Sequence, residues 1–226
     1  MDEEVLKQSE IFHGITSDER KELLTCLGAY RRSYQKGELI FRMGEETQVL
    51  GIVLSGAVNI EKDDIWGNES ILSHVEPGEV FGETYACVPG ERLMVNVVAA
   101  EPAEILFLDV NHVLKTCPNA CGFHQQLVHN LVNVMASKNL ALTRKISHTA
   151  PKTIRGRLMS YLSYQVLRQG SFELELPFDR QQLADYLVVD RSAMSAELGK
   201  MKADGLLEYR KNRFLIRREH REEFGE

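Results

Sequence analysis

Residues 119–146 contain no proline and only one glycine, Gly122. Such a stretch predicts one continuous helix, and its 28 residues at about 1.5 Å each give a rod about 42 Å long. A rod of that length is long beside a domain of roughly 100 residues. The helix therefore divides the chain of 226 residues into a part before it and a part after it.

Two apolar faces run along this predicted helix. On one face lie the candidate dimerisation residues Val128, Leu131, Met135, Lys138 and Leu142, with the lysine as an interruption. Leu127, Val134 and Ala141 line the face beside it. Two apolar faces need two partners. One can be the preceding domain, and the other is most simply the same helix of a second copy of the chain. Burial of the whole helix inside one domain is the alternative, against which the polar residues between the apolar positions argue.

The part before the helix has the pattern of β structure. Thr16 and Glu19 form a capping box, which predicts a short helix that ends near Leu27. Six short β-rich runs follow, separated by glycine and other turn residues, at 38–42, 50–54, 57–61, 70–75, 94–98 and 104–108. This spacing predicts an antiparallel sandwich or barrel, with residues 1–118 as the first domain.

The part after the helix starts a second domain. Pro151 predicts a break, because proline disrupts a continuing helix. A second apolar-faced helix then runs to Gly170, and a short alternating strand follows it. We therefore place the dimerisation helix at residues 119–147 and the second domain at residues 148–226.

Residues 179–205 contain two short helices separated by a short turn. Asp179 caps the first helix, with Gln182 completing the capping box, and Asp190 caps the second. Gly205 is a helix stop. A capped helix, a short turn and a second capped helix form the helix-turn-helix pattern. The second helix of this motif presents the side chains of its first turns to base edges of DNA.

A basic hairpin follows at residues 206–217, and three of the four residues in its turn, 210–213, are basic. Such a wing suits contact with phosphate groups. The candidate DNA-binding residues are Arg180, Gln181, Asp190, Arg191, Ser192, Met194, Ser195, Lys200, Lys211 and Arg213. Residues 1–150 carry 13 basic and 21 acidic side chains, a balance of −8, whereas residues 151–226 carry 14 and 12, a balance of +2. This asymmetry favours a polyanionic partner for the second domain. A protein-binding receptor module with no DNA role is the alternative.

Other classes find less support. A cupin-like enzyme would hold a metal through several histidines, and His74 is the only histidine within residues 30–108. No P-loop and no Ser-His-Asp order is visible, so we expect neither an enzyme nor a metal site. No window reaches about 18 apolar residues without a charge, and three of the first four residues are acidic where a signal peptide would be basic. We expect a cytoplasmic protein with no membrane partner.

A further set of motifs spans nearly the whole chain. They are Gly37-Glu38, Gly44, Gly56, Pro-Gly-Glu-Val-Phe-Gly-Glu at 77–83, residues 97–99 leading to 105–109, and residues 183–187 leading to 190–195. With the order of elements, these motifs resemble the Crp/Fnr family (cyclic-AMP receptor protein and fumarate-nitrate regulator) of bacterial transcription factors. The resemblance implies an α+β fold: an N-terminal cyclic-nucleotide-binding-like antiparallel β-barrel (double-stranded β-helix), a long dimerisation helix and a C-terminal winged helix-turn-helix. It also implies a homodimer, a small-molecule or redox signal read in the barrel, palindromic double-stranded DNA, and RNA polymerase as a partner.

The candidate effector site departs from the family pattern. In members that bind a cyclic nucleotide, a Gly-Glu pair is followed by an Arg-Ser pair that holds the cyclic phosphate. Gly82 and Glu83 match the first pair and Arg92 matches the arginine, but Leu93 replaces the serine and removes a donor. The candidate effector-binding residues are Gly82, Glu83, Thr84, Arg92, Leu93, Leu142 and Thr143. This departure argues against cyclic AMP, and Glu83 either contacts the effector or accepts a structural hydrogen bond in a turn.

The identity of a cofactor stays open. Iron–sulfur members carry cysteines near the N-terminus, and the first 25 residues here contain none. Haem or another small effector is an alternative, with His13, His74, His112, His124, His129 and His148 as candidate ligands. Cys117 and Cys121 are either buried thiols or part of a redox or metal sensor.

The predicted recognition helix also departs from its relatives. Ser195 is followed by Ala196, where many relatives have Ser-Arg. An arginine that forks onto guanine contributes roughly 1–3 kcal/mol of discrimination. We therefore predict that Arg191 and Ser192 carry more of the base reading, and that the preferred DNA site differs from the family's usual half-site.

Overall fold

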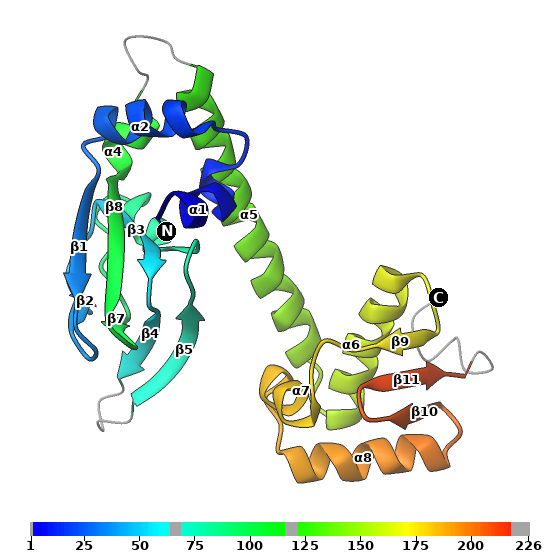
Figure 1. The fold of residues 1–226 in the computed structure, drawn as a ribbon. Coiled ribbons are helices and arrows are strands. Elements are labelled where there is room, and N and C mark those ends of the chain that lie inside the picture. Colours follow the sequence, from blue (N-terminus) through cyan, green and yellow to red (C-terminus); the bar gives the residue numbers. More distant parts are fainter. Residues whose placement is uncertain (1, 64–68, 116–121, 218–226) are drawn as a thin grey trace. The chain divides into compact units, whose positions relative to one another are not determined.

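The computed structural model describes residues 2–63, 69–115 and 122–217 (Figure 1). The chain divides into two compact units, Met1–Ser137 and Lys138–Glu226. The long helix α5 (Gly122–Thr149) contributes its first part to one unit and its last part to the other. Over the described residues, no helix combines the length and apolar character needed to cross a membrane.

Short helices precede the strands of the first unit. They are α1 (Asp2–Gln8), the 3-10 turn η1 (Glu10–Phe12) and α2 (Ser17–Cys26). The predicted capping box is present, because Thr16 accepts from the Glu19 amide and the Glu19 carboxylate accepts from the Thr16 amide. Local pairing of this kind fixes the start of α2 without help from the rest of the fold.

The strands of the first unit form two antiparallel sheets (Figure 1). One contains, in spatial order, β1 (Tyr30–Tyr34), β8 (Ala103–Asp109), β3 (Val49–Ser55) and β6 (Val80–Phe81). The other contains β2 (Leu39–Phe41), β7 (Asn96–Ala99), β4 (Val58–Asp63) and β5 (Glu69–Val75). The six predicted runs are thus confirmed as strands, in two separate sheets over the described residues. The prediction missed β1, whose sequence Tyr-Arg-Arg-Ser-Tyr is mostly exposed, and the two-residue strand β6.

The sheet that contains β3 and β8 is buried on both faces. Leu50, Ile52 and Leu54 of β3 pack with the helices, whereas Val53 packs with the second sheet. In β8, Leu106 and Leu108 alternate in the same way with Ile105 and Phe107. This period of two places every apolar side chain of these strands in one of two cores, which explains their nearly continuous apolar sequence.

The helices α3 (Glu83–Ala86), α4 (Val110–Leu114) and the start of α5 complete the first unit. Leu127, Leu131 and Val134 of α5 are buried with the helices and β3 in one core. The Asn130 amide donates to the carbonyl oxygens of Ile11 and His13, which ties α5 to η1. The predicted long helix is confirmed from Gly122 onward and continues to Thr149, two residues beyond the expected end at residue 147.

The second unit continues from α5 through α6 (Ile154–Gln169), β9 (Glu173–Glu175), α7 (Arg180–Leu187) and α8 (Arg191–Ala203). The strands β10 (Leu207–Arg210) and β11 (Arg213–Ile216) follow and form an antiparallel sheet in the order β10-β11-β9. One core joins α6, α7 and α8 to this sheet; it includes Leu158, Leu162, Leu183, Leu187, Met194, Leu198, Leu207 and Phe214.

Candidate nucleic-acid interface

Both helices of the motif, α7 and α8, begin at a capping residue. The Asp179 carboxylate accepts from the Gln182 amide and the Gln182 side chain accepts from the Asp179 amide, each at 2.8 Å. Asp190 accepts from the Ala193 amide at 2.8 Å and from the Ser192 hydroxyl. Hydrogen bonds from Ser192 and Ala193 lower the pKa of Asp190. Both predicted caps are confirmed, and Asp190 and Ser192 together shape the first turn of α8.

The α8 helix turns one face inward and the other outward. Met194, Leu198 and Met201 are completely buried in the core of the second unit. Arg191, Ser192, Ser195 and Lys200 are exposed, as contact with DNA would require. Met194 was a candidate DNA-binding residue, and this prediction is wrong, because its side chain is 0% exposed and packs beneath the helix.

Two arginines that the sequence analysis did not single out hold this motif in place. The Arg155 guanidinium donates to Glu197 at 2.7 Å and to Asp204 at 2.6 Å, which joins α6 to the middle and the end of α8. Arg157 donates to the carbonyl oxygens of Leu187 and Val188, in the turn. The sequence shows only that both arginines lie on the polar side of α6, and this position alone does not predict a hydrogen-bond partner in α8 or in the turn.

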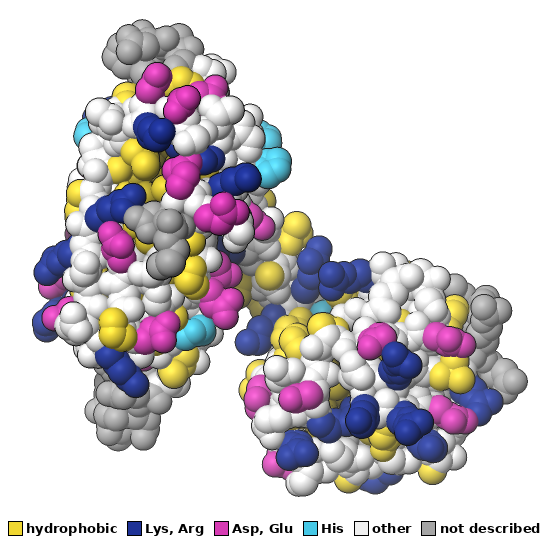
Figure 2. Space-filling model, in the orientation of Figure 1, with side chains coloured by type: hydrophobic (Ala, Val, Ile, Leu, Met, Phe, Trp, Pro, Cys, Tyr) yellow, Lys and Arg dark blue, Asp and Glu magenta, His cyan; other side chains and the backbone are white. Residues whose placement is uncertain are grey.

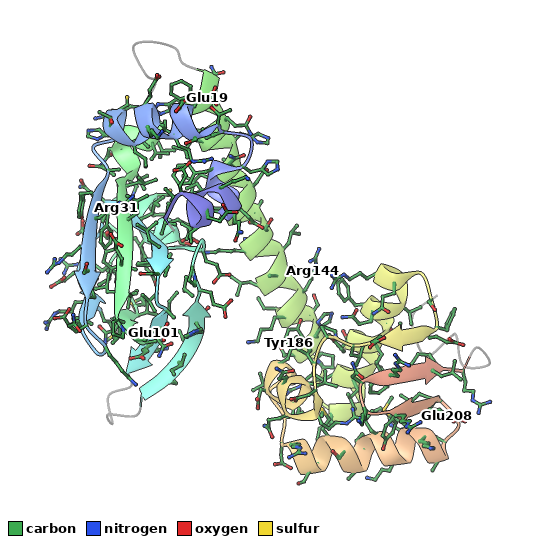
Figure 3. The ribbon with its side chains drawn as sticks, viewed as in Figure 1. Glu19, Arg31, Glu101, Arg144, Tyr186 and Glu208 are labelled. Atoms are coloured by element: carbon green, nitrogen blue, oxygen red, sulfur yellow. The ribbon has the colours of Figure 1, made fainter. Side chains whose placement is uncertain are left out.

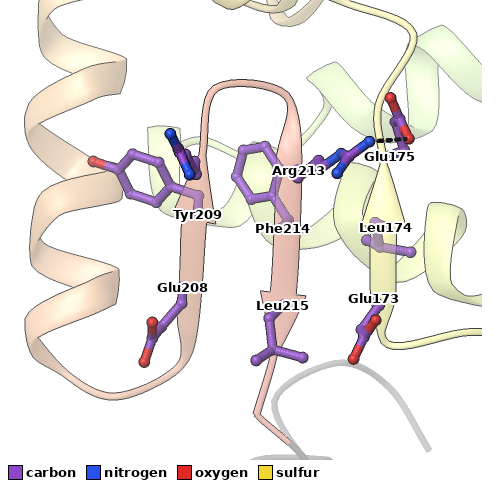
Figure 4. A pocket seen from close by; sticks show the side chains of 9 residues that line it. Glu173, Leu174, Glu175, Glu208, Tyr209, Arg213, Phe214 and Leu215 are labelled. Atoms are coloured by element: carbon purple, nitrogen blue, oxygen red, sulfur yellow. Dashed lines mark ion pairs between the residues drawn. The ribbon is translucent and has the colours of Figure 1, made fainter.

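The wing is the hairpin of β10 and β11, with Lys211 and Asn212 at its turn. Lys211 and Arg213 are exposed, and Arg213 lies 3.5 Å from Glu175 (Figure 4). A groove of about 470 Å³ lies on this sheet, where Glu208, Leu215 and Glu173 form one cross-strand row. Figure 2 shows many Lys and Arg side chains over one face of the second unit.

Two further candidates lie at the start of α7. Gln181 is exposed, and its amide donates to Asp185 at 2.9 Å. Arg180 is half-buried, and its guanidinium carbon lies 4.8 Å and 5.2 Å from the ring centroids of Tyr209 and Phe214. Arg180 also donates to the Lys211 carbonyl at 3.2 Å. Its side chain is therefore committed to the wing.

The candidate effector residues of the first unit lie at the start of α3 and in the segment that follows it. Gly82 has φ 76°, and a Cβ at this position would lie 2.6 Å from the Phe41 ring, so that only glycine fits here. Glu83 is 3% exposed at the start of α3, whereas Thr84 is exposed. Exposed Arg92 donates to the Gly44 carbonyl at 2.9 Å. Leu93 is 2% exposed.

The other two candidate effector residues, Leu142 and Thr143, lie on α5 in the second unit, and both are exposed. Cys117 and Cys121 lie outside the described residues. Burial, followed by the nearby Glu83, raises the pKa of the Cys87 thiol. Among the residues that the structure describes, no three His, Cys, Asp or Glu side chains come together as a metal site would require.

Several histidines considered as haem ligands already have partners within the protein. The His124 Nε2 donates to the Val113 carbonyl at 2.8 Å, and His112 Nδ1 lies 3.1 Å from the Leu27 carbonyl. His148 Nδ1 lies 2.8 Å from the Tyr186 hydroxyl, and burial lowers the pKa of His148. Each of these contacts uses one ring nitrogen and ties the histidine to a neighbouring element of the fold.

The candidate dimerisation residues separate into three groups by burial. Leu131 is 1% exposed in the core of its own unit, so its assignment to the dimer seam is wrong. Val128 and Met135 are half-buried against that core, whereas Lys138 and Leu142 are exposed. The neighbouring residues Val132 and Ile146 are 57% and 66% exposed. The exposed apolar face of α5 is therefore rotated about the helix axis relative to the predicted face.

Comparisons with known proteins agree with this architecture. The family described as "Cyclic nucleotide-binding domain" matches residues 31–119, and that described as "Crp-like helix-turn-helix domain" matches residues 156–221. The "Cyclic AMP receptor protein" of Thermus thermophilus is 28% identical over 89% of each chain. The "CRP-like protein Clp" of Xanthomonas euvesicatoria is 25% identical over 80% of this chain and 81% of its own.

Solved structures show the same fold. The Thermus thermophilus catabolite activator protein has a TM-score of 0.50 at 24% identity, and the match covers 92% of this chain and 94% of that chain. The OCPA-complexed CprK has a TM-score of 0.59 at 15% identity, with 86% of this chain and 88% of that chain covered.

A double-sheet domain of the cyclic-nucleotide-binding kind, followed by a winged helix-turn-helix, defines an effector-responsive, DNA-binding transcription regulator. Such proteins are not enzymes. The chain belongs to the Crp/Fnr family of these regulators.

Proposed function

We propose that the protein acts as a homodimer that binds a palindromic site in double-stranded DNA, and that an effector bound by the first unit controls this binding. The exposed face of α8 beside a basic wing carries this proposal, because both can meet one duplex from the same unit. RNA polymerase is the further partner that a regulator of this kind would engage.

The open face of α5 supports the dimer. Val132, Met135, Asn139, Leu142 and Ile146 follow one another in steps of three and four residues, the spacing of a coiled-coil seam. Val132, Asn139 and Ile146 take the a positions, and Met135 and Leu142 take the d positions. Branched side chains at a with leucine at d favour two parallel helices. Val132, Leu142 and Ile146 are all more than half exposed in a single copy, which leaves them for a partner.

A parallel pair of α5 helices would also present two recognition helices, one from each protomer, to the DNA. Half-sites one duplex turn apart, about 34 Å, are read by two α8 helices related by a two-fold axis. We propose that Arg191 and Ser192 read bases in each half-site, with Ser195 beside them, and that Lys200, Lys211 and Arg213 contact phosphates. Ala196 is exposed on the same face and has no hydrogen-bonding group, so the base opposite it is not read by a forked contact.

Selection of duplexes from a random pool tests this function. We expect a palindrome with half-site centres about 10 base pairs apart, and affinity that falls steeply as salt increases. Arg191→Ala is expected to relax selectivity at one base pair of each half-site, at a cost of about 1–3 kcal/mol. Binding that is absent at every salt concentration would instead support a module for protein partners only.

We further propose that the effector binds near Gly82, Glu83, Thr84 and Arg92 and is not cyclic AMP. Arg92 already donates to Gly44, and the buried Leu93 side chain offers no donor to a phosphate. Calorimetric titration with cyclic AMP should give no binding heat at micromolar protein. Native mass spectrometry of protein purified without air would show whether haem or another small molecule stays bound. A micromolar dissociation constant for cyclic AMP would contradict this proposal.

A further inference from the structure

Arg180 is the first residue of α7, yet its guanidinium lies over the wing. The rings of Tyr209 and Phe214 are cross-strand partners on β10 and β11, with centroids 5.7 Å apart (Figure 4). The Arg180 guanidinium carbon lies 4.8 Å from one centroid and 5.2 Å from the other. A cation this close to two ring faces is held by the charge distribution of both rings.

Arg180 also binds the turn of the wing. Its Nη2 donates to the Lys211 carbonyl at 3.2 Å. Lys211 has φ 56°, in the left-handed region that residues other than glycine rarely adopt. On the other side of the turn, Asn212 donates to the Leu176 carbonyl at 3.0 Å, and its own carbonyl accepts from the Leu176 amide at 2.9 Å. The strained turn is thus held by three hydrogen bonds, one to Arg180 at the start of α7 and two to Leu176, directly after β9.

These contacts hold the half-buried Arg180 side chain on the wing. Its planar group is used by two rings, and one of its donors is used by a carbonyl oxygen. Burial lowers the pKa of Arg180, as expected where a guanidinium has lost part of its hydration. Lys211 is exposed at the tip, and the side chain of Arg213 is 74% exposed.

We propose that Arg180 is a positioning residue: it locks the wing to α7, so that Lys211 and Arg213 reach the DNA backbone, and does not itself touch DNA. The inference rests on the DNA-binding function proposed above. It assigns to Arg180 a different role from the direct contact expected from the sequence. A lysine could replace a simple phosphate contact but not this one, because it lacks the planar fork that stacks and donates together.

The test compares Arg180→Lys in two backgrounds of the full chain, the wild type and the double variant Lys211→Asn, Arg213→Gln. Asparagine suits the left-handed backbone at position 211. The probe is the duplex recovered by selection, titrated by fluorescence anisotropy at several salt concentrations. We expect Arg180→Lys to weaken binding about fivefold in the wild type and less than about twofold in the double variant. Arg168→Lys, on the exposed side of α6, is the matched control and should bind as the wild type does.

A second measurement needs no DNA. Hydrogen exchange of the backbone amides at residues 207–216 should be faster in Arg180→Lys than in the wild type and unchanged in Arg168→Lys. Unchanged exchange would overturn the proposal. It would also be overturned if Arg180→Ala in the double variant lowered the slope of log affinity against log salt by about 0.9, the value for one lost phosphate contact. If the wild type binds no duplex at all, the DNA-binding proposal fails, while the exchange experiment still decides the role of Arg180.

Discussion

Val188 ends α7 in the left-handed backbone region, with φ 54° and ψ 55°. A branched side chain is unfavourable in this conformation, because its Cβ approaches the carbonyl that follows. The Val188 side chain is 64% exposed, so it gains little from burial, while its carbonyl accepts from Arg157. Contacts with the rest of the unit therefore hold the turn before the recognition helix in a backbone conformation that valine disfavours.

Val188→Gly should raise the free energy of unfolding by about 1 kcal/mol, because glycine adopts this backbone without strain. Thermal and urea unfolding of the full chain measure the change. Val189→Gly is the matched control: Val189 is half-buried against the core and has no positive φ, so its removal should destabilise the protein. Equal destabilisation by both variants would mean that the turn is not strained.

His148 is 3% exposed, and its ring packs against Tyr161 and Tyr164 of α6 and Tyr186 of α7. Arg144, over the ring of Tyr164, is the nearby charge; Figure 3 labels Arg144 and Tyr186. Burial first, and then Arg144, lower the pKa of His148 below its ordinary value of about 6.5. This histidine joins the last turn of α5 to both helices as a neutral ring.

Because the folded pKa is lowered, the unfolded chain binds the proton more readily. The contribution of neutral His148 should therefore be complete above about pH 6.5 and be lost as the pH falls through the lowered pKa. His148→Phe keeps an aromatic ring without the titration, and should show a smaller loss of melting temperature between pH 7.5 and pH 5. His129→Gln, at an exposed position, should keep the full loss. A profile for His148→Phe identical to that of the wild type would disprove the assignment.

At the scale of elements, sequence alone predicted what is locally determined. The caps at Thr16, Asp179 and Asp190 follow from neighbouring residues, and the structure confirms them. Leu131 could not be assigned, because two adjacent faces of α5 are similarly apolar and only the packing of η1 and α2 decides which one the protomer buries. The contacts of Arg180 likewise could not be predicted, because they are made with the rings of Tyr209 and Phe214, about 30 residues away along the chain.

Leu142→Lys should shift the dimer to monomer at micromolar concentration, because a charge would enter the a/d seam. Analytical ultracentrifugation measures the shift. Leu140→Lys is the matched control on the same helix, since Leu140 is 52% exposed but lies off the seam. If Leu140→Lys dissociates the protein and Leu142→Lys does not, the seam is on another face.

In the proposed seam, Asn139 would take the middle a position, where a polar side chain specifies register at a cost in stability. Asn139→Leu should therefore strengthen association and add higher oligomers beside the dimer. Sedimentation velocity, with Asn133→Leu as an exposed control off the seam, measures both effects. A weaker dimer in Asn139→Leu would exclude this role.

At the scale of the whole molecule, one helix serves both the sensing unit and the DNA-binding unit. Binding of two half-sites by one dimer makes the second contact intramolecular, so affinity depends on spacing. Insertion of five base pairs between half-sites, half a duplex turn, should lower affinity at least about tenfold. A mobility-shift titration measures this, and Leu142→Lys should bind both duplexes equally. Equal binding of both duplexes by the wild type would contradict the two-fold arrangement.

Residues 136–147 of α5 are all exposed in a single copy. An unpaired chain therefore offers three turns of helix, held mainly by their own backbone hydrogen bonds, to any protease in the cell. Pairing would cover one side of these turns and slow their opening. The lifetime of a newly made chain would then depend on the concentration of the chains already present, because only paired chains are protected. The protein would accumulate only above a threshold concentration, whether or not an effector is present.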